Sequence, residues 1–155
     1  MLVAGRVDAA LLAEPASSAA ILRAMLAAGQ TLERAIDCQK AWAAATGYTA
    51  IPQAGLAITD KLARQIGADG ASALQAALEN AVQSVNRNPA AAAAIAAPAL
   101  ELPAPVIERS IAFSNLVAER ATRARNDLTA LFETLAKDDL RIIGGKLPDD
   151  RFYAL

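Results

Sequence analysis

The amino-acid sequence predicts a helix-rich α/β protein with about two short strands and six to eight helices. Residues 7–13 form an apolar run after a glycine, which is typical of a buried strand. Residues 49–58 are also apolar, but their proline and glycine favour an edge strand, a bend or a crossover over a regular central strand. From Thr59 onward, large apolar residues recur every three or four positions, as on amphipathic helices. We therefore expect a small sheet covered by helices.

Composition limits the possible classes of function. The chain has 155 residues, of which 55% are hydrophobic, so a domain with a core is expected. Its 15 basic and 16 acidic residues give a net charge of −1, which argues against nucleic acid as a partner. The chain has no histidine and a single cysteine, Cys38, so it lacks the residues for disulfide frameworks, Cys/His zinc sites and histidine bases. We expect no catalytic residue, no metal site and no cofactor.

Two helices are predicted before the second strand. Pro15 ends the first strand and suits a first helical turn, so a helix is expected over residues 16–28, with Gly29 as its stop. A second helix is predicted over residues 32–45, with Thr31 as its N-cap. The apolar stripe of the first helix, which should face the core, consists of Ile21, Leu22, Met25 and Leu26.

The rest of the chain is predicted to be mostly helical. The expected helices are a short one capped by Thr59 and ending at Gly67, and four more over about 71–86, 89–97, 104–115 and 118–137. The tail, residues 142–153, is predicted to be a loop, or a loop with one short turn of helix, whose aromatic residues pin it to the protein.

Glu14 is the first candidate site residue. It follows the predicted strand and precedes a helix, and ligands of open α/β sheets bind beyond the carboxyl ends of strands. A carboxylate there would repel an anion and favour an amine, an amidine-like ring edge or a hydroxyl donor. The alternative interpretation is an ordinary acid of the first turn, stabilised by the helix dipole.

Gln53 is the second candidate, because it is a polar residue inside an apolar segment and could point into a cleft. The alternative is a glutamine that faces solvent on an edge strand. Trp42 and Tyr48 could stack on a planar ligand, or could simply pack in the core and at a helix end.

Three stretches, in this order, resemble a known family. Residues 5–15 read GRVDAALLAEP, residues 86–92 read NRNPAAA, and residues 143–153 read IGGKLPDDRFY. The first resembles the "G-x-V-D-A … P" segment of ABC-transporter substrate-binding proteins of the nitrate/sulfonate/taurine and thiamine-pyrimidine-precursor type. The second is similar to the "N-x-N-P-x-x-A" helix junction of that family, and the third to its C-terminal endings.

The resemblance implies the C-terminal half of a type II periplasmic-binding-protein fold, in which two lobes close over a solute. Residues 1–48 would end the second lobe, and residues 49–155 would return to the first lobe and add C-terminal helices. Glu14 and Gln53 would contact the solute, and an ABC permease would receive it. Such a protein is not an enzyme and is periplasmic or extracytoplasmic, with an N-terminal half and a signal peptide that we do not find in this sequence. The isolated chain would self-associate through exposed strand edges.

Two other functions stay open. A helical interaction or assembly module would need no small ligand. A pyrimidine-precursor biosynthetic protein on the same fold is the third possibility, although the lack of histidine argues against it. The identity of the solute is not revealed, because neither candidate position holds the Arg or Lys that a sulfonate or nitrate would favour.

Overall fold

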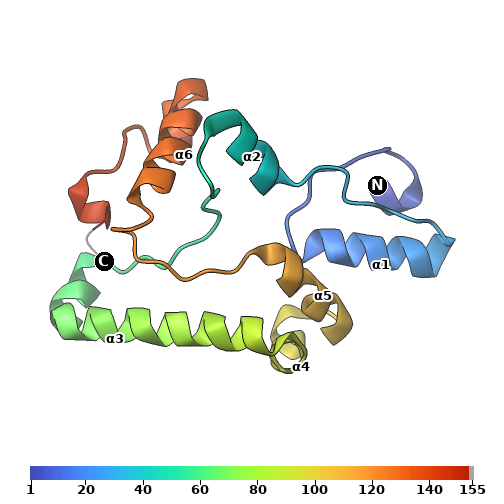
Figure 1. Cartoon of the computed structure of the whole chain (residues 1–155), viewed down its shortest axis with the longest axis horizontal. Helices are drawn as coiled ribbons and strands as arrows, with labels where there is room; N and C mark the ends of the chain where they lie inside the picture. Colours follow the sequence, from blue (N-terminus) through green and yellow to red (C-terminus); the bar gives the residue numbers. More distant parts are fainter. Residues whose placement is uncertain (154–155) are drawn as a thin grey trace. The chain divides into compact units, whose positions relative to one another are not determined.

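The computed structural model describes residues 1–153 and is built from helices (Figure 1). The described α-helices are α1 (Ala16–Ala28), α2 (Cys38–Thr46), α3 (Asp60–Arg87), α4 (Pro89–Leu100), α5 (Ala104–Ser114) and α6 (Arg125–Asp138). Short 3-10 helices are η1 (Leu2–Ala4), η2 (Leu140–Ile143) and η3 (Asp150–Tyr153).

The prediction of an α/β fold is wrong, because residues 1–153 contain no β-strand. Residues 7–13 and 49–58, predicted as strands, are irregular and pair with no other segment in a ladder. A strand is stable only beside a hydrogen-bonded neighbour, and the described chain offers none. Leu11 is 88% exposed and Leu12 41% exposed, so the first segment is not buried either. The described residues therefore do not form the type II periplasmic-binding-protein fold that the resemblance implies.

Local sequence signals place most helix ends correctly. The helix α1 has the predicted bounds, and Gly29 follows it with a φ of 60°. Thr59 caps the start of α3, since its Oγ1 accepts a hydrogen bond from the backbone N–H of Leu62 at 3.2 Å. Asn88 caps α4 in the same way, accepting from the backbone N–H of Ala91 at 3.2 Å. These ends are set by contacts within a few residues, which is why the sequence predicts them.

Apart from shifts of up to three residues at a helix end, three elements differ from the prediction. The helix α2 begins later than expected because Asp37 is its cap, accepting the backbone N–H of Gln39 at 3.0 Å. The helix α6 also begins later, at Arg125. The predicted stop at Gly67 is a kink, with φ 62° and ψ −171°, inside the long helix α3.

The chain divides into two units, one made of residues 1–34 and 78–117, the other of residues 35–77 together with the chain from 118 onward. In the first unit, α5 packs against both α4 and α1. Its buried apolar side chains are Ala24, Ala93, Val106 and Ile107. In the second unit, α6 packs against η2, and the buried apolar side chains are Ala130 and Tyr153. Each core is small and relies partly on alanine, which removes little apolar area from water.

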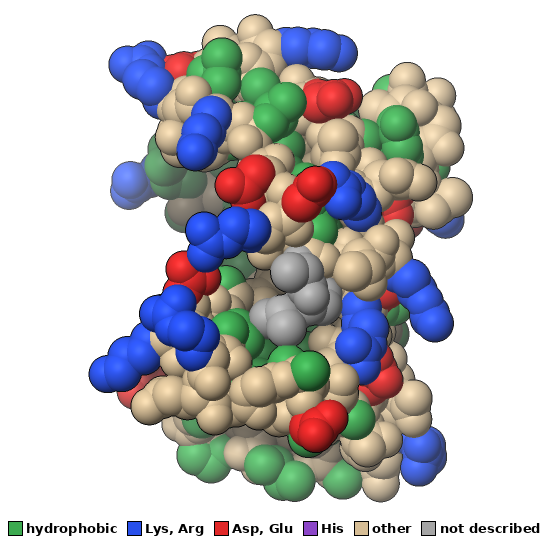
Figure 2. All heavy atoms as spheres, turned by 90° about the vertical axis from the view of Figure 1, so that its left-hand side faces the viewer, with side chains coloured by type: hydrophobic (Ala, Val, Ile, Leu, Met, Phe, Trp, Pro, Cys, Tyr) green, Lys and Arg blue, Asp and Glu red, His purple; other side chains and the backbone are tan. Residues whose placement is uncertain are grey.

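Many large apolar side chains lie at the surface. The predicted inward stripe of α1 is only partly buried, with Met25 54% exposed and Leu26 73% exposed. The helix α3 buries none of its residues. On the face drawn in Figure 2, hydrophobic side chains lie between interspersed basic and acidic ones.

Among the described residues, no single helix is long and apolar enough to span a membrane. Within residues 1–153, α4 and α5 taken together reach that length and composition, with a bend of 113° between them.

Candidate functional site

Glu14 lies at the start of α1, where the helix leaves backbone N–H groups unpaired. Its carboxylate accepts a hydrogen bond from the Ser17 hydroxyl and another, at 3.2 Å, from the backbone N–H of Ser18. The helix N-terminus also carries a partial positive charge, which favours a carboxylate there. Glu14 therefore lies two residues before α1 and accepts hydrogen bonds from the first turn of this helix, although it is not itself a residue of that turn.

Arg34 completes this site from the irregular segment 29–37. One guanidinium nitrogen, Nη2, lies 2.5 Å from Glu14 Oε1 and donates to Ser18 Oγ at 2.8 Å. The guanidinium carbon lies 3.7 Å from the ring centroid of Phe113, which belongs to α5. The Glu14 side chain is 9% exposed and that of Arg34 29% exposed. We call this group the Glu14 cluster, consisting of Glu14, Ser17, Ser18, Arg34 and Phe113.

The pKa of Glu14 reflects two opposing effects. Burial raises this pKa, but the hydrogen bonds from Ser17, Arg34 and Ser18 lower it more, so the pKa lies below its ordinary value of 4.5. The carboxylate is therefore ionised at neutral pH and serves as a hydrogen-bond acceptor. It has no proton to give, which argues against a role as a general acid.

Gln53 lies on the surface of the second unit, in the irregular segment 49–58. Its side chain is exposed, as the alternative interpretation of this residue expected. Glu14 belongs to the first unit, so the two candidate residues lie in different units. That one solute contacts both Glu14 and Gln53 stays a prediction.

Gln39 is a polar residue in contact with segment 49–58 that the sequence did not indicate as a candidate. Its Oε1 accepts from the backbone N–H of Ile51 at 2.8 Å, and its Nε2 donates to the carbonyl of Ile51 at 3.4 Å. The side chain thus ties α2 to the segment that carries Gln53. No sequence signal marks this contact, because it joins two residues across an irregular connection.

The two aromatic candidates, Trp42 and Tyr48, differ in burial. Trp42 has a buried indole N–H that meets no hydrogen-bond acceptor within residues 1–153. Such an unpaired buried donor costs about 1–3 kcal/mol. Tyr48 is 41% exposed. Stacking of either ring on a ligand stays a prediction.

The second unit contains an apolar groove of about 420 Å³ between α6 and the tail. Phe132 and Phe152 meet edge to face in its wall, with ring centroids 5.6 Å apart. Tyr153 is buried beside them, and its hydroxyl lies 3.3 Å from Thr129 Oγ1. The aromatic residues therefore hold the tail against α6, as predicted. The groove also contains Lys146 and Asp149, whose opposite charges give it no preference for either sign of ligand.

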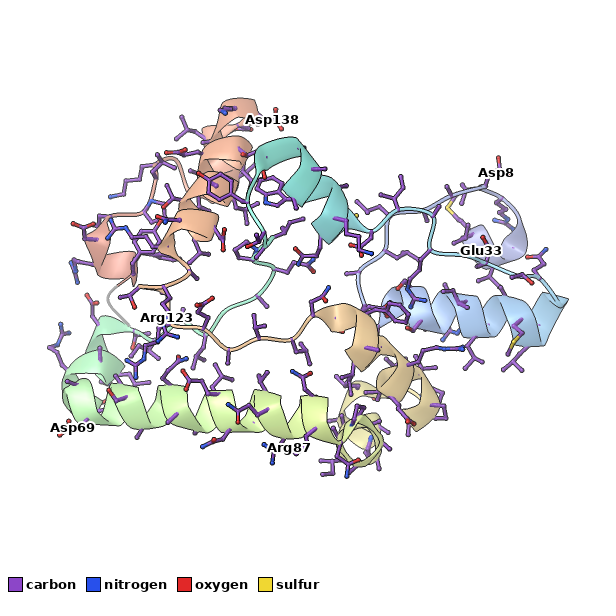
Figure 3. The ribbon with its side chains drawn as sticks, viewed as in Figure 1. Asp8, Glu33, Asp69, Arg87, Arg123 and Asp138 are labelled. Atoms are coloured by element: carbon purple, nitrogen blue, oxygen red, sulfur yellow. The ribbon has the colours of Figure 1, made fainter. Side chains whose placement is uncertain are left out.

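Charged side chains are otherwise dispersed. Figure 3 shows Asp69, beyond the kink of α3, and Arg87, at its last residue, both pointing away from the helix. In the part of the chain that the structure describes, no group of three or more His, Cys, Asp or Glu side chains could hold a metal ion. Cys38 is exposed at the first residue of α2.

The Glu14 cluster is thus a polar site in which side chains from three segments of the first unit meet. It combines a fixed anion, two serine hydroxyls and an aromatic ring, and its serines have no histidine to serve as a base. Comparison with known proteins finds no family model, no curated protein and no solved structure that matches the chain.

Proposed function

We propose that the chain is part of the solute-binding component of an ABC importer and contributes Glu14 to solute capture. The proposal rests on the ordered set of three motifs, at residues 5–15, 86–92 and 143–153. One structural observation carries it further. The segment that leads to Glu14 is irregular and unpaired, and it exposes Leu11 and Leu12 directly before the carboxylate.

Exposed leucines next to a fixed carboxylate indicate a surface that another part of the protein covers. Covering a large apolar side chain contributes about 1.5–3 kcal/mol. Leu11 is 88% exposed, and Leu56 in segment 49–58 is 59% exposed, so both irregular segments would gain from such a cover. In the proposed protein, the cover is the N-terminal half of the same polypeptide.

The mechanism of such a component is a shift between conformations. A solute that binds the closed form more tightly than the open form raises the population of the closed form, which then docks on the permease. An ionised Glu14 favours a solute that carries N–H or O–H donors over a sulfonate or a nitrate. The component works outside the cytoplasm and performs no chemical step.

Calorimetric titration of the complete protein tests this proposal. The panel contains amines, amidines, sulfonates and nitrate, and at least one of these solutes should bind. Glu14→Gln should then weaken binding by about tenfold or more, because it removes a charged acceptor. Asp8→Asn is the matched control, since Asp8 is an exposed acid of the same motif and should leave the affinity unchanged. A complete protein that binds no solute, or an affinity that Glu14→Gln leaves intact, would contradict the proposal.

A helical interaction module without a small ligand is the second candidate. It is favoured by the wholly helical regular structure of residues 1–153 and by apolar side chains on helix surfaces, such as Leu26 at 73% and Ile95 at 81% exposure. This function predicts that Leu26→Ser and Ile95→Ser abolish binding of a protein partner. The solute-binding function predicts that the same changes leave solute affinity unaltered.

A further inference from the structure

We infer that the Glu14 cluster is a niche for a planar cation, a guanidinium or amidinium group, and that Arg34 occupies this niche as an internal stand-in for the solute. The inference rests on the proposed function and adds the chemical class of the solute. It also makes Arg34 a residue that a solute must displace.

The Glu14 carboxylate, which is the anionic part of the niche, is held by groups other than Arg34. The hydroxyl of Ser17 and the backbone N–H of Ser18 both donate to the Glu14 carboxylate, and both come from the first turn of α1. Neither of these two donors belongs to Arg34. When Arg34 leaves, the carboxylate keeps these two donors and stays in place.

The contacts of Arg34 define the shape and charge of the preferred ligand. Its guanidinium donates from Nη2 and, at 3.3 Å, from Nε to Glu14 Oε1, and from Nη2 to Ser18 Oγ at 2.8 Å. Its carbon lies 3.7 Å from the Phe113 ring centroid, within the range of a cation–π contact. A planar cation with several N–H donors satisfies the carboxylate, the hydroxyl and the ring together. A round ammonium group or a neutral planar group satisfies only some of them.

Arg34 is the displaceable member of the cluster. It comes from the irregular segment 29–37, whereas the other four members lie on α1, directly before it, or on α5. Its side chain is 29% exposed, so the niche opens to solvent on the side of the arginine. A tethered group competes with a free ligand at an effective concentration in the millimolar range. Arg34 should therefore weaken the binding of any external cation.

NMR titration of the chain tests this inference, with ethylguanidinium as the probe and the backbone amide of Ser18 as the reporter. In Arg34→Ala, ethylguanidinium should produce saturable shifts at this amide, with an affinity about tenfold or more above that of the unsubstituted chain. N-ethylurea has the same shape without the charge, and it should produce no saturable shift. Adding Glu14→Gln to Arg34→Ala should abolish the response to ethylguanidinium.

Arg23→Ala is the matched control, because Arg23 is an exposed arginine of α1 and lies outside the cluster. It should leave the weak response of the unsubstituted chain unchanged. A second measurement does not depend on the folding of Arg34→Ala. In Glu14→Gln alone, the Nε proton of Arg34 should exchange with water as fast as that of Arg23, because its charged acceptor is gone.

Three results of these measurements would overturn the inference. These are an affinity of Arg34→Ala no higher than that of Arg23→Ala, equal binding of N-ethylurea, or slow exchange of the Arg34 Nε proton in Glu14→Gln. Capture of a non-cationic solute by the complete protein would also overturn it and leave the proposed function standing. Binding of ethylguanidinium to Arg34→Ala, combined with a complete protein that binds no solute, would contradict the proposed function alone.

Discussion

At the residue scale, Glu14 accepts hydrogen bonds from Ser17, Ser18 and Arg34. The sequence identifies it through its place before a helix, and that local relation also explains its bonds to Ser17 and Ser18. The sequence does not identify Arg34 or Phe113 as its neighbours. Arg34 stands 20 positions away along the chain, and no periodicity or capping rule connects residues at such a distance. The position of Glu14 was thus predictable, but the composition of its site was not.

The lowered pKa of Glu14 predicts how stability depends on pH. Because the unfolded chain binds this proton more tightly than the folded chain, folding is stabilised above pH 4.5, and this contribution is lost as the pH falls through the lower folded-state pKa. Urea denaturation at pH 7, 5, 4 and 3 should show this decline. Glu14→Gln should be less stable than the unsubstituted chain at pH 7 and should show a flatter decline below pH 5. An equal decline in both proteins would contradict the role given to Glu14.

Gln39 and Gln53 provide a matched pair of glutamines. Gln39→Ala removes two hydrogen bonds to Ile51 and should lower the free energy of unfolding by about 1–2 kcal/mol. It should also speed hydrogen exchange at the Ile51 amide. Gln53→Ala changes an exposed side chain and should alter stability by less than about 0.5 kcal/mol. Equal effects of the two substitutions would contradict the anchoring role of Gln39.

At the element scale, helices were predicted well and strands were not. Helix ends such as Gly29 and Asn88 depend on contacts within a few residues, which the sequence contains. A strand depends on a neighbour that can lie anywhere in the chain, so an apolar run such as residues 7–13 cannot establish a strand by itself. The late start of α2 has a local cause that was overlooked, because Asp37 competes with Thr31 as the cap.

The cap of α4 can be tested with two asparagines. Asn88→Ala removes the side-chain acceptor for the backbone N–H of Ala91 and should cost about 1 kcal/mol of stability. Asn80→Ala is the control, since Asn80 is exposed inside α3, where alanine is the better helix former. Chemical denaturation should find Asn80→Ala neutral or slightly stabilising. A loss of stability as large as that of Asn88→Ala would contradict the capping account.

At the scale of the whole molecule, each unit has a small core and exposes large apolar side chains. Composition explains the small cores, because alanine supplies much of the hydrophobic fraction and buries little apolar area per residue. It could not predict which apolar stripes stay exposed, since this depends on which helices pack together. The exposure of Met25 and Leu26 on α1 is an example. What covers these surfaces is therefore the main question about the function of the chain.

Self-association provides one test of that exposure. Leu11 and Leu12 are exposed in an irregular segment, so Leu11→Ser combined with Leu12→Ser should reduce self-association and leave the midpoint of thermal unfolding unchanged. Sedimentation velocity measures the first quantity and circular dichroism the second. A lower unfolding midpoint would show instead that these leucines belong to the core.

The proposed function, a solute-binding component of an importer, predicts tight solute capture only when this chain is joined to the rest of that component. The most direct test is a thermal-shift screen of the chain alone beside the complete product of its gene, with amines, amidines, sulfonates and nitrate. We predict that at least one solute raises the unfolding midpoint of the complete protein by several degrees and leaves that of the chain alone unchanged. A complete protein without any shift, or a gene that encodes no additional polypeptide in frame, would contradict the account.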